Sequence, residues 1–140
     1  MENSSSKPIK LEIVTPDRGV VREEVEEIST PGKEGYLGIL PGHAPLLSEL
    51  QPGELTYKKS GKNHYLAING GFAEVLPYRV IILTQAAERS NEVDRQRAEK
   101  ARQRAEERLA RFDDSTVDFQ RARAALARAV TRLHVSDRTA

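Results

Sequence analysis

The sequence contains no cysteine and no tryptophan, and aromatic residues make up only 5% of its 140 positions. The lack of cysteine excludes a disulfide framework, a thiolate metal site and a cysteine nucleophile. The 22 basic and 21 acidic residues leave a net charge of +1. The chain therefore has neither the excess basic charge of a typical nucleic-acid-binding domain nor an acidic tail.

Long apolar segments are also missing. No run approaches the roughly 20 consecutive apolar residues that a helix needs to span a bilayer. Any association with a membrane is therefore expected to depend on a partner. The first eight residues are mostly polar and lack the apolar core of a signal peptide, so we expect residues 1–8 to form a disordered leader.

The common catalytic and metal-binding motifs are absent from the sequence. The chain has no Gly-x-x-x-x-Gly-Lys-Ser/Thr phosphate loop, no Gly-x-Ser-x-Gly nucleophile elbow and no His-Glu-x-x-His zinc motif. Its histidines, His43, His64 and His134, are far apart along the chain. The sequence therefore predicts neither an enzyme nor a protein that requires a metal.

The residues that are present change in kind near residue 88. All nine glycines and all seven prolines precede this position, whereas the segment after it is rich in arginine and alanine. Glycine and proline favour turns and interrupt helices, while alanine and arginine are strong helix formers. We therefore predict an α+β protein, with a β-sandwich domain over residues 9–87 and a helical domain over residues 88–140.

Short alternating segments separated by turn signals fill the first part. Ile9, Leu11 and Ile13 would share one face of a strand, with Lys10 and Glu12 on the other face. Similar segments follow, bounded by Pro-Gly, Ser-Gly-Lys and Asn-Gly-Gly. Many short strands at this spacing are typical of an antiparallel sandwich or barrel.

The stretch over residues 35–47 is the most distinctive in the chain. It combines glycines and prolines with aliphatic side chains, which is too interrupted for a helix and too apolar for a free linker. The pattern predicts two short strands joined by a rigid Pro-Gly-His-Ala-Pro corner. We expect Ile39, Leu40, Leu46 and Leu47 to pin this corner to a core.

Two helices that form an antiparallel hairpin are predicted in the second part. Their apolar stripes are Ala98, Ala101, Ala105, Leu109 and Phe112, and then Phe119, Ala122, Leu126, Ala129 and Leu133. Ser115 is expected to cap the second helix, with Asp118 near its positive end. Burial stabilises by about 25 cal/mol per Å² of apolar area, so alanine stripes contribute little. The hairpin is therefore expected to be marginally held and able to open.

Arginines on the second helix suggest a binding site. Arg128 and Arg132 are four residues apart and repel each other unless an anion lies between them. In an antiparallel hairpin, Asp94 and Arg97 would lie beside them. Such a site has guanidinium groups for phosphate oxygens and a carboxylate for an amino group. The alternative, which composition alone favours, is a solvated arginine face.

Several motifs resemble the epsilon subunit of F-type ATP synthases. The strongest is Gly-Ile-Leu-Pro-Gly-His-Ala-Pro-Leu-Leu at residues 38–47. Others are Val14–Asp17, Pro52–Leu55, Gly70–Val75 and Gln85–Arg89. The resemblance extends from Ile9 to about Val135. It implies a sandwich of about ten strands followed by two helices, in a non-catalytic rotor subunit that contacts the gamma subunit and the c-ring. It also implies a peripheral position on the cytoplasmic face of a bacterial membrane.

The resemblance also implies a regulatory nucleotide. Some bacterial members bind ATP through an Ile/Leu-Asp-x-x-Arg-Ala motif, to which Val-Asp-Arg-Gln-Arg-Ala at residues 93–98 is similar. The implied ATP-binding residues are Glu88, Val93, Asp94, Arg97, Ala98, Arg128 and Arg132. In such members ATP stabilises the folded hairpin, and without ATP the helices extend along gamma and inhibit ATP hydrolysis.

The implied partner contacts lie at two places. Glu34, Tyr36 and His43 match the region that the family turns toward the c-ring, although the acid often found at the Tyr36 position is absent. Arg121, Arg123, Arg128 and Arg132 would meet an acidic segment of the catalytic beta subunit when the hairpin is extended. A different hypothesis, a nucleic-acid-binding hairpin on a β module, depends on the arginines alone, and the scarcity of aromatic residues to stack on bases disfavours it.

Overall fold

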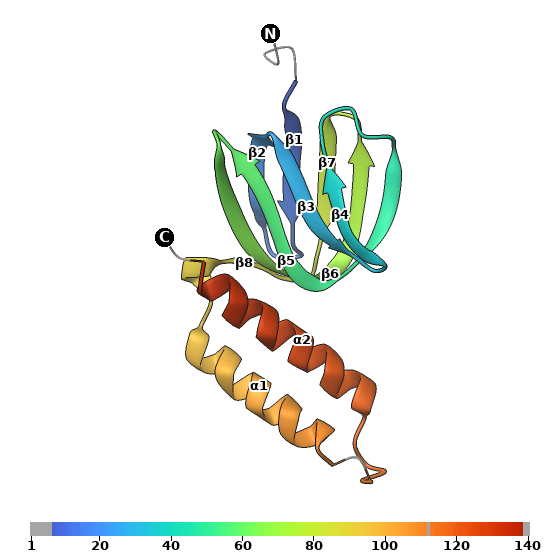
Figure 1. The fold of residues 1–140 in the computed structure, drawn as a ribbon, viewed down its shortest axis with the longest axis vertical. Helices are drawn as coiled ribbons and strands as arrows, with labels where there is room; N and C mark the ends of the chain where they lie inside the picture. Colours follow the sequence, from blue (N-terminus) through green and yellow to red (C-terminus); the bar gives the residue numbers. More distant parts are fainter. Residues whose placement is uncertain (1–6, 112, 139–140) are drawn as a thin grey trace.

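The computed structural model describes residues 7–111 and 113–138 (Figure 1). The strands are β1 (Ile9–Val14), β2 (Gly19–Val25), β3 (Glu27–Gly32), β4 (Gly35–Ile39), β5 (Leu46–Lys59), β6 (Lys62–Leu76), β7 (Arg79–Leu83) and β8 (Ala87–Arg89). A 3₁₀ turn, η1 (Ser90–Glu92), leads to α1 (Arg95–Leu109) and α2 (Phe119–Ser136). Most of the predicted leader, residues 1–8, and Phe112 lie outside the described residues.

The predicted β-sandwich followed by two helices is confirmed. The strands follow the order β2-β1-β7-β6-β5-β3-β4, and β8 pairs with β6. The sheet is mixed rather than strictly antiparallel, because β1 and β7 run parallel. Eight strands are described instead of about ten. The difference arises because β5 and β6, of 14 and 15 residues, curve strongly and each replaces two predicted strands (Figure 1).

Two glycines allow β6 to curve without ending. Gly70 and Gly71 have φ angles of 76° and 112°, which side chains other than glycine rarely adopt. A Cβ atom on Gly71 would also lie 1.8 Å from the carbonyl oxygen of Leu83 on β7. The predicted corner at Asn69–Gly71 is therefore a bend within one strand.

The sandwich has a dense aliphatic core. Ile9, Leu11 and Ile13 are fully buried, as their alternation predicts. They pack with buried side chains from every other strand, including Leu55 and Tyr57 on β5. All members of this core cluster belong to the strands, and none comes from α1 or α2. The hydrophobic core of the sandwich is therefore built without side chains of the helices.

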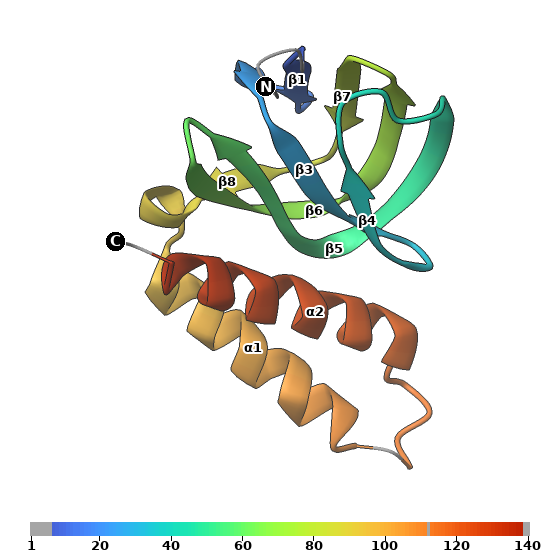
Figure 2. The same cartoon turned by 45° about the horizontal axis from the view of Figure 1, so that its top comes forward.

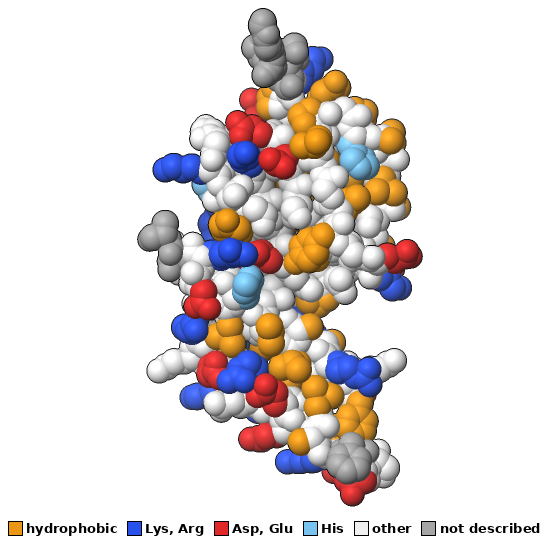
Figure 3. Space-filling model, viewed as in Figure 1, with side chains coloured by type: hydrophobic (Ala, Val, Ile, Leu, Met, Phe, Trp, Pro, Cys, Tyr) orange, Lys and Arg blue, Asp and Glu red, His pale blue; other side chains and the backbone are white. Residues whose placement is uncertain are grey.

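The corner after β4 forms as predicted, but its packing is different. Gly42, with a φ of 87°, donates its N–H to the carbonyl of Pro77 at 2.7 Å and holds the turn. Ile39 is buried, whereas the exposed fractions of Leu40 and Leu47 are 60% and 71%. Leu46 is also exposed, so the expectation that three leucines pin the corner to the core is wrong. Figure 3 shows apolar side chains on the surface at this end of the sandwich.

The two helices form an antiparallel hairpin in which α2 lies between α1 and the sandwich (Figure 2). Asp94 caps α1 by accepting a hydrogen bond from the N–H of Arg97, and Asp118 caps α2 through the N–H of Arg121. The prediction that Ser115 caps α2 is wrong, because the helix begins later. Asp114 instead accepts hydrogen bonds from the N–H and hydroxyl of Thr116 and shapes the turn.

The helices are lined with alanine, as predicted. The buried side chains are Ala98 and Ala105 on α1 and Ala122, Ala129 and Val135 on α2. The helices can approach closely because these side chains are small, but each buries little apolar area. Polar contacts must therefore contribute much of the attachment between the hairpin and the sandwich.

Candidate functional site

A cavity of about 270 Å³ lies between the hairpin and the outer face of the sandwich. We call it the hairpin cavity. Its lining is Ala67, Ile68, Asn69, Ala86, Glu88, Arg97, Arg128 and Arg132. The strand side is mostly apolar, with one amide and one carboxylate, and the helix side supplies three guanidinium groups.

Strand pairing and helix packing bring these residues together. Antiparallel pairing of β8 with β6 places Glu88 opposite Ala67. Asp94 fixes the start of α1, so Arg97 projects from its first turn. Arg128 and Arg132 lie one turn apart on α2, which packs against both α1 and β6. The cavity thus exists only while the hairpin is docked on the sandwich.

One of the three guanidinium groups is already paired. Arg132 donates to both carboxylate oxygens of Glu88, through Nε at 2.6 Å and through a terminal nitrogen at 3.0 Å. The two side chains are 25% and 26% exposed, so this bidentate pair is largely shielded from solvent. It joins the C-terminal half of α2 to the sandwich.

The other two guanidinium groups in the cavity, those of Arg97 and Arg128, have no side-chain hydrogen bond or ion pair with any described residue. Glu88 offsets the charge of Arg132 only, so the cavity keeps an excess of positive charge. Guanidinium groups bind phosphate and carboxylate oxygens through paired N–H donors. The arrangement therefore suits a polyanion that contacts both helices.

The structure brings together four of the seven residues assigned to nucleotide binding. Glu88, Arg97, Arg128 and Arg132 all line the cavity. The Asp94 carboxylate is used as the cap of α1, Val93 links η1 to α1, and Ala98 is buried. These three are not part of the lining, and they position the first turn of α1.

Sequence reasoning missed the strand side of the cavity. Ala67, Ile68, Asn69 and Ala86 form this wall. No motif marks them, because they become neighbours only through the pairing of β6 with β8. The one sequence signal for this wall was the expectation that Glu88 takes part in the site. Glu88 pairs with Ala67 on β6, so its position also marks the strand residues around it.

The residues predicted to face the c-ring do not form one cluster. Glu34 lies in the turn before β4, and His43 lies in the corner beyond the other end of this strand. Tyr36 is exposed, and its hydroxyl accepts a hydrogen bond from the N–H of Glu54 at 3.2 Å. The predicted contacts are therefore spread over the length of β4.

The four arginines predicted to contact the beta subunit fall into two groups that differ in exposure. Arg121 and Arg123 are exposed on α2, whereas Arg128 and Arg132 are half-buried toward the sandwich. In the docked hairpin they do not form one continuous basic surface. This arrangement weakens the hypothesis of a nucleic-acid-binding helix face, which needs such a surface.

The connection between the sandwich and α1 is held by an ionic network, which we call the hinge network. Glu92 accepts hydrogen bonds from the N–H of Arg89 at 2.8 Å and from Arg18 at 3.2 Å, and these contacts lower the pKa of its carboxyl group. Arg89 donates to the hydroxyl of Tyr57, which in turn donates to Glu23. The chain is therefore fixed to the sandwich as far as Glu92.

The charges of the hinge network perturb one another. Hydrogen bonds from Lys59 and Tyr57 lower the pKa of Glu23. Burial raises the pKa of Tyr57, and its hydrogen bond to the Glu23 carboxylate raises it further. The phenol therefore remains neutral and the carboxylate ionised at neutral pH.

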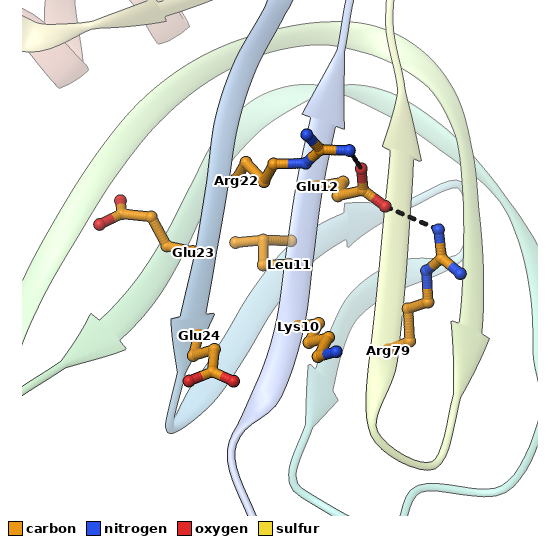
Figure 4. Close-up of a pocket in the computed structure, with 7 residues that line it drawn as sticks. All are labelled: Lys10, Leu11, Glu12, Arg22, Glu23, Glu24 and Arg79. Atoms are coloured by element: carbon orange, nitrogen blue, oxygen red, sulfur yellow. Dashed lines mark hydrogen bonds and ion pairs between the residues drawn. The ribbon is translucent and has the colours of Figure 1, made fainter.

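A groove of about 480 Å³ crosses the outer face of β1, β2 and β7 (Figure 4). At its centre Glu12 lies between Arg79 at 2.9 Å and Arg22 at 3.3 Å. The hydrogen bond from Arg79 is the main cause of the lowered pKa of Glu12. Because Glu12 already offsets these cations and two further glutamates line the groove, it is a poorer anion site than the hairpin cavity.

The described residues include neither a metal-binding cluster nor a membrane-spanning helix. Within residues 7–111 and 113–138, no three His, Asp or Glu side chains are grouped in a way that could hold a metal ion. Neither α1 nor α2 has the length and apolar character that a membrane-spanning helix requires.

Comparisons with known proteins cover nearly the whole chain. Residues 8–90 match the family described as the beta-sandwich domain of the ATP synthase delta/epsilon chain, and residues 91–137 match its long alpha-helix domain. An ATP synthase epsilon chain from Herpetosiphon aurantiacus is 55% identical over 129 residues, which cover 92% of this chain and 94% of the relative. One from Nitratidesulfovibrio vulgaris is 49% identical, with coverage of 92% and 96%.

A solved structure is similar along the whole fold. It is a chain in the cryo-EM structure of the Euglena gracilis mitochondrial ATP synthase, OSCP/F1/c-ring, with a TM-score of 0.79 and 28% identity. The match covers 96% of this chain and 84% of that chain. Both the sandwich and the hairpin therefore have counterparts in known proteins.

Proposed function

The chain belongs to the ATP synthase delta/epsilon family as an epsilon subunit, and we propose that its hairpin is an ATP-sensitive regulator of the rotary motor. In this proposal the subunit is non-catalytic. The sandwich couples the gamma subunit to the c-ring, and the docked hairpin permits ATP hydrolysis. The extended hairpin inhibits hydrolysis through contacts with gamma and an acidic segment of the beta subunit.

The observation that carries the proposal is the positive charge of Arg97 and Arg128 in the hairpin cavity, which no side chain of the described residues offsets. Arg97 comes from α1, Arg128 comes from α2, and the opposite wall comes from the sandwich. A polyphosphate held by both guanidinium groups would bridge the two helices. Because the cavity is assembled only in the docked state, such a ligand binds that state more tightly and shifts the population toward it.

The paired residues have a different role in this proposal. The bond between Glu88 and Arg132 holds α2 in place before any ligand arrives. We expect Arg97 and Arg128 to contact phosphate oxygens first, while Arg132 keeps its carboxylate partner. The volume of about 270 Å³ is just below the range of about 300–1,000 Å³ typical of small-molecule sites, so part of the nucleotide is expected to remain in solvent.

The proposed location follows from the partners. We place the subunit on the cytoplasmic face of a bacterial membrane, where it would contact the membrane only through the c-ring. The proposed contacts on that side are Glu34, Tyr36 and His43, which lie before, within and after β4. The exposed Arg121 and Arg123 would meet the beta subunit first, because they are accessible before the hairpin opens.

Calorimetry with ATP on the isolated chain tests the nucleotide part. We expect binding by the wild type, and weakening of about tenfold or more in Arg97→Ala and Arg128→Ala, since each removes charged hydrogen bonds of about 1.5–3 kcal/mol. Arg123→Ala is the matched control, because this arginine lies on the same helix outside the cavity. A wild type that binds no ATP at millimolar concentration would contradict the proposal.

Truncation tests the inhibitory part. Because residues up to Glu92 are fixed to the sandwich, the cleanest variant ends there and lacks residues 93–140. The assembled enzyme is expected to hydrolyse ATP faster with this variant than with the full chain, while gamma and the c-ring remain bound. Unchanged hydrolysis in an intact assembly would reject an inhibitory hairpin.

A further inference from the structure

A second set of contacts joins the hairpin to the sandwich, away from the hairpin cavity. Arg138, which follows the end of α2, donates to both carboxylate oxygens of Glu54 on β5, each at 3.0 Å. The Glu54 side chain is only 13% exposed. A bidentate pair with a shielded carboxylate is stronger and more specific in geometry than an ordinary surface ion pair.

An aromatic ring completes this contact. The guanidinium carbon of Arg138 lies 4.5 Å from the centre of the Tyr65 ring on β6, within the range of a cation–π interaction. His134, one turn earlier on α2, has its Nε2 3.2 Å from a terminal nitrogen of Arg138. The sandwich thus presents one carboxylate and one ring that hold a single guanidinium group.

The same end of α2 is also tied to α1. Arg95, at the start of α1, donates to the hydroxyl of Ser136 at 2.5 Å and to the carboxylate of Asp137 at 2.6 Å. Contacts that hold the end of α2 on the sandwich therefore also restrain the start of α1. The two helices are fixed together close to the hinge network.

We propose that Arg138, Glu54 and Tyr65 form a latch that holds the hairpin on the sandwich without nucleotide. None of these residues lines the hairpin cavity, so the latch and a bound ligand act on the same docked state from separate places. The latch sets the fraction of molecules in which the hairpin is docked in the absence of ATP. Its link to ATP rests on the proposed function, but its effect on docking does not.

The latch has a consequence for ligand affinity. A ligand that binds only the docked state has an apparent dissociation constant equal to the intrinsic one divided by the docked fraction. Loss of the latch lowers that fraction. Substitution of Arg138 therefore weakens ATP binding although Arg138 touches no part of the cavity.

Amide hydrogen exchange on the full chain without nucleotide tests the latch. The informative amides are those around Ala122–Ala129, because fraying of the last turn of α2 would not reach them. Arg138→Gln and Glu54→Gln are each expected to speed their exchange about threefold to tenfold, the range for a well-formed, partly shielded pair. Arg138→Lys keeps the positive charge but loses the two parallel N–H donors of the guanidinium group. This variant is expected to give an exchange rate between those of the wild type and Arg138→Gln.

A double-mutant cycle and a matched control complete the test. If the two residues act as one unit, the Glu54→Gln/Arg138→Gln double variant exchanges no faster than the more affected single variant. Arg123→Gln removes an exposed arginine of the same helix and is expected to change nothing. Unchanged exchange in Arg138→Gln, or effects that simply add in the double variant, would overturn the latch.

Repeating the measurement with saturating ATP separates the two proposals. ATP is expected to slow exchange in the wild type and in the latch variants. If ATP has no effect on the wild type, the nucleotide proposal fails, while the comparison among variants without ATP still decides for or against the latch.

Discussion

The sandwich and the hairpin are stabilised in different ways. The sandwich buries isoleucine, leucine or valine side chains from β1 to β7 and an alanine from β8, whereas the described residues of the hairpin bury four alanines and one valine. At about 25 cal/mol per Å², the sandwich gains far more from burial than the hairpin does. Two bidentate arginine–carboxylate pairs, one to Glu88 and one to Glu54, make up part of that difference.

This contrast is suited to a regulatory element. A hairpin held by a large apolar interface would not leave the sandwich at a useful rate. Charged groups regain favourable interactions with water when they separate, so the cost of undocking is small compared with the cost of unfolding the sandwich. The molecule thus combines a densely packed sandwich with a hairpin whose attachment depends more on polar contacts.

The largest expected effect comes from the sandwich core. Leu55 is fully buried, and Leu55→Ala is expected to lower the free energy of unfolding by about 2–5 kcal/mol, through lost burial and a residual cavity. Leu47→Ala is the control, because Leu47 is 71% exposed and should change little. Equal losses for both variants in urea unfolding would show that the core assignment is wrong.

An intermediate loss of stability is expected when a larger side chain replaces one of the buried alanines of the hairpin. Ala129 is 2% exposed, so Ala129→Leu should force the hairpin away from its contacts at a cost of about 1–3 kcal/mol. The loss should appear as faster hydrogen exchange in both helices, with strand amides unchanged. Ala127→Leu, at an exposed position of α2, is the control. Faster exchange in β5 and β6 as well would contradict the separation between the two regions.

The smallest change in stability is expected when acid protonates Glu92, which lies at the junction between the sandwich and the hairpin. The carboxyl group of Glu92 has a pKa below its ordinary value of 4.5, chiefly because the N–H of Arg89 donates to it. Its contribution to stability is therefore complete above about pH 4.5 and is lost as the pH falls through the folded-state pKa. The wild type should be slightly more stable than Glu92→Gln at pH 7, and the difference should shrink below pH 4.5. A difference that stays constant to pH 3 would exclude this ionised carboxylate as its source.

Sequence patterns were sufficient for features that depend on local spacing. Alternation identified the β1 core face, and the change in composition near residue 88 separated most strand residues from the helices, although β8 crosses this boundary and α1 begins only at Arg95. Helix length and antiparallel packing allowed Asp94, Arg97, Arg128 and Arg132 to converge, although composition alone favoured a solvated arginine face, and Asp94 does not line the cavity. These features need only the periodicity of each element and the direction of its neighbour.

Features that depend on sheet geometry could not be predicted in this way. The strand wall of the hairpin cavity and the Glu54–Tyr65 pair arise from the register of β5, β6 and β8. Register is fixed by contacts across the whole sheet, so no short motif records it. The exposed Leu40, Leu46 and Leu47 were misassigned for a different reason, since apolar content alone does not show whether another part of the chain covers these positions.

The anchoring of Glu92 determines how the hairpin can travel. If the hairpin undocks as proposed, the motion would begin at Val93, and α1 would act as a rigid arm that swings from one point on the rim of the sandwich. At 1.5 Å per residue its 15 residues give an arm of about 22 Å, and α2, with 18 residues, would extend the reach to roughly 50 Å if the two were laid end to end. A few broken ion pairs near the pivot could therefore carry the tip across a distance larger than the radius of a small domain.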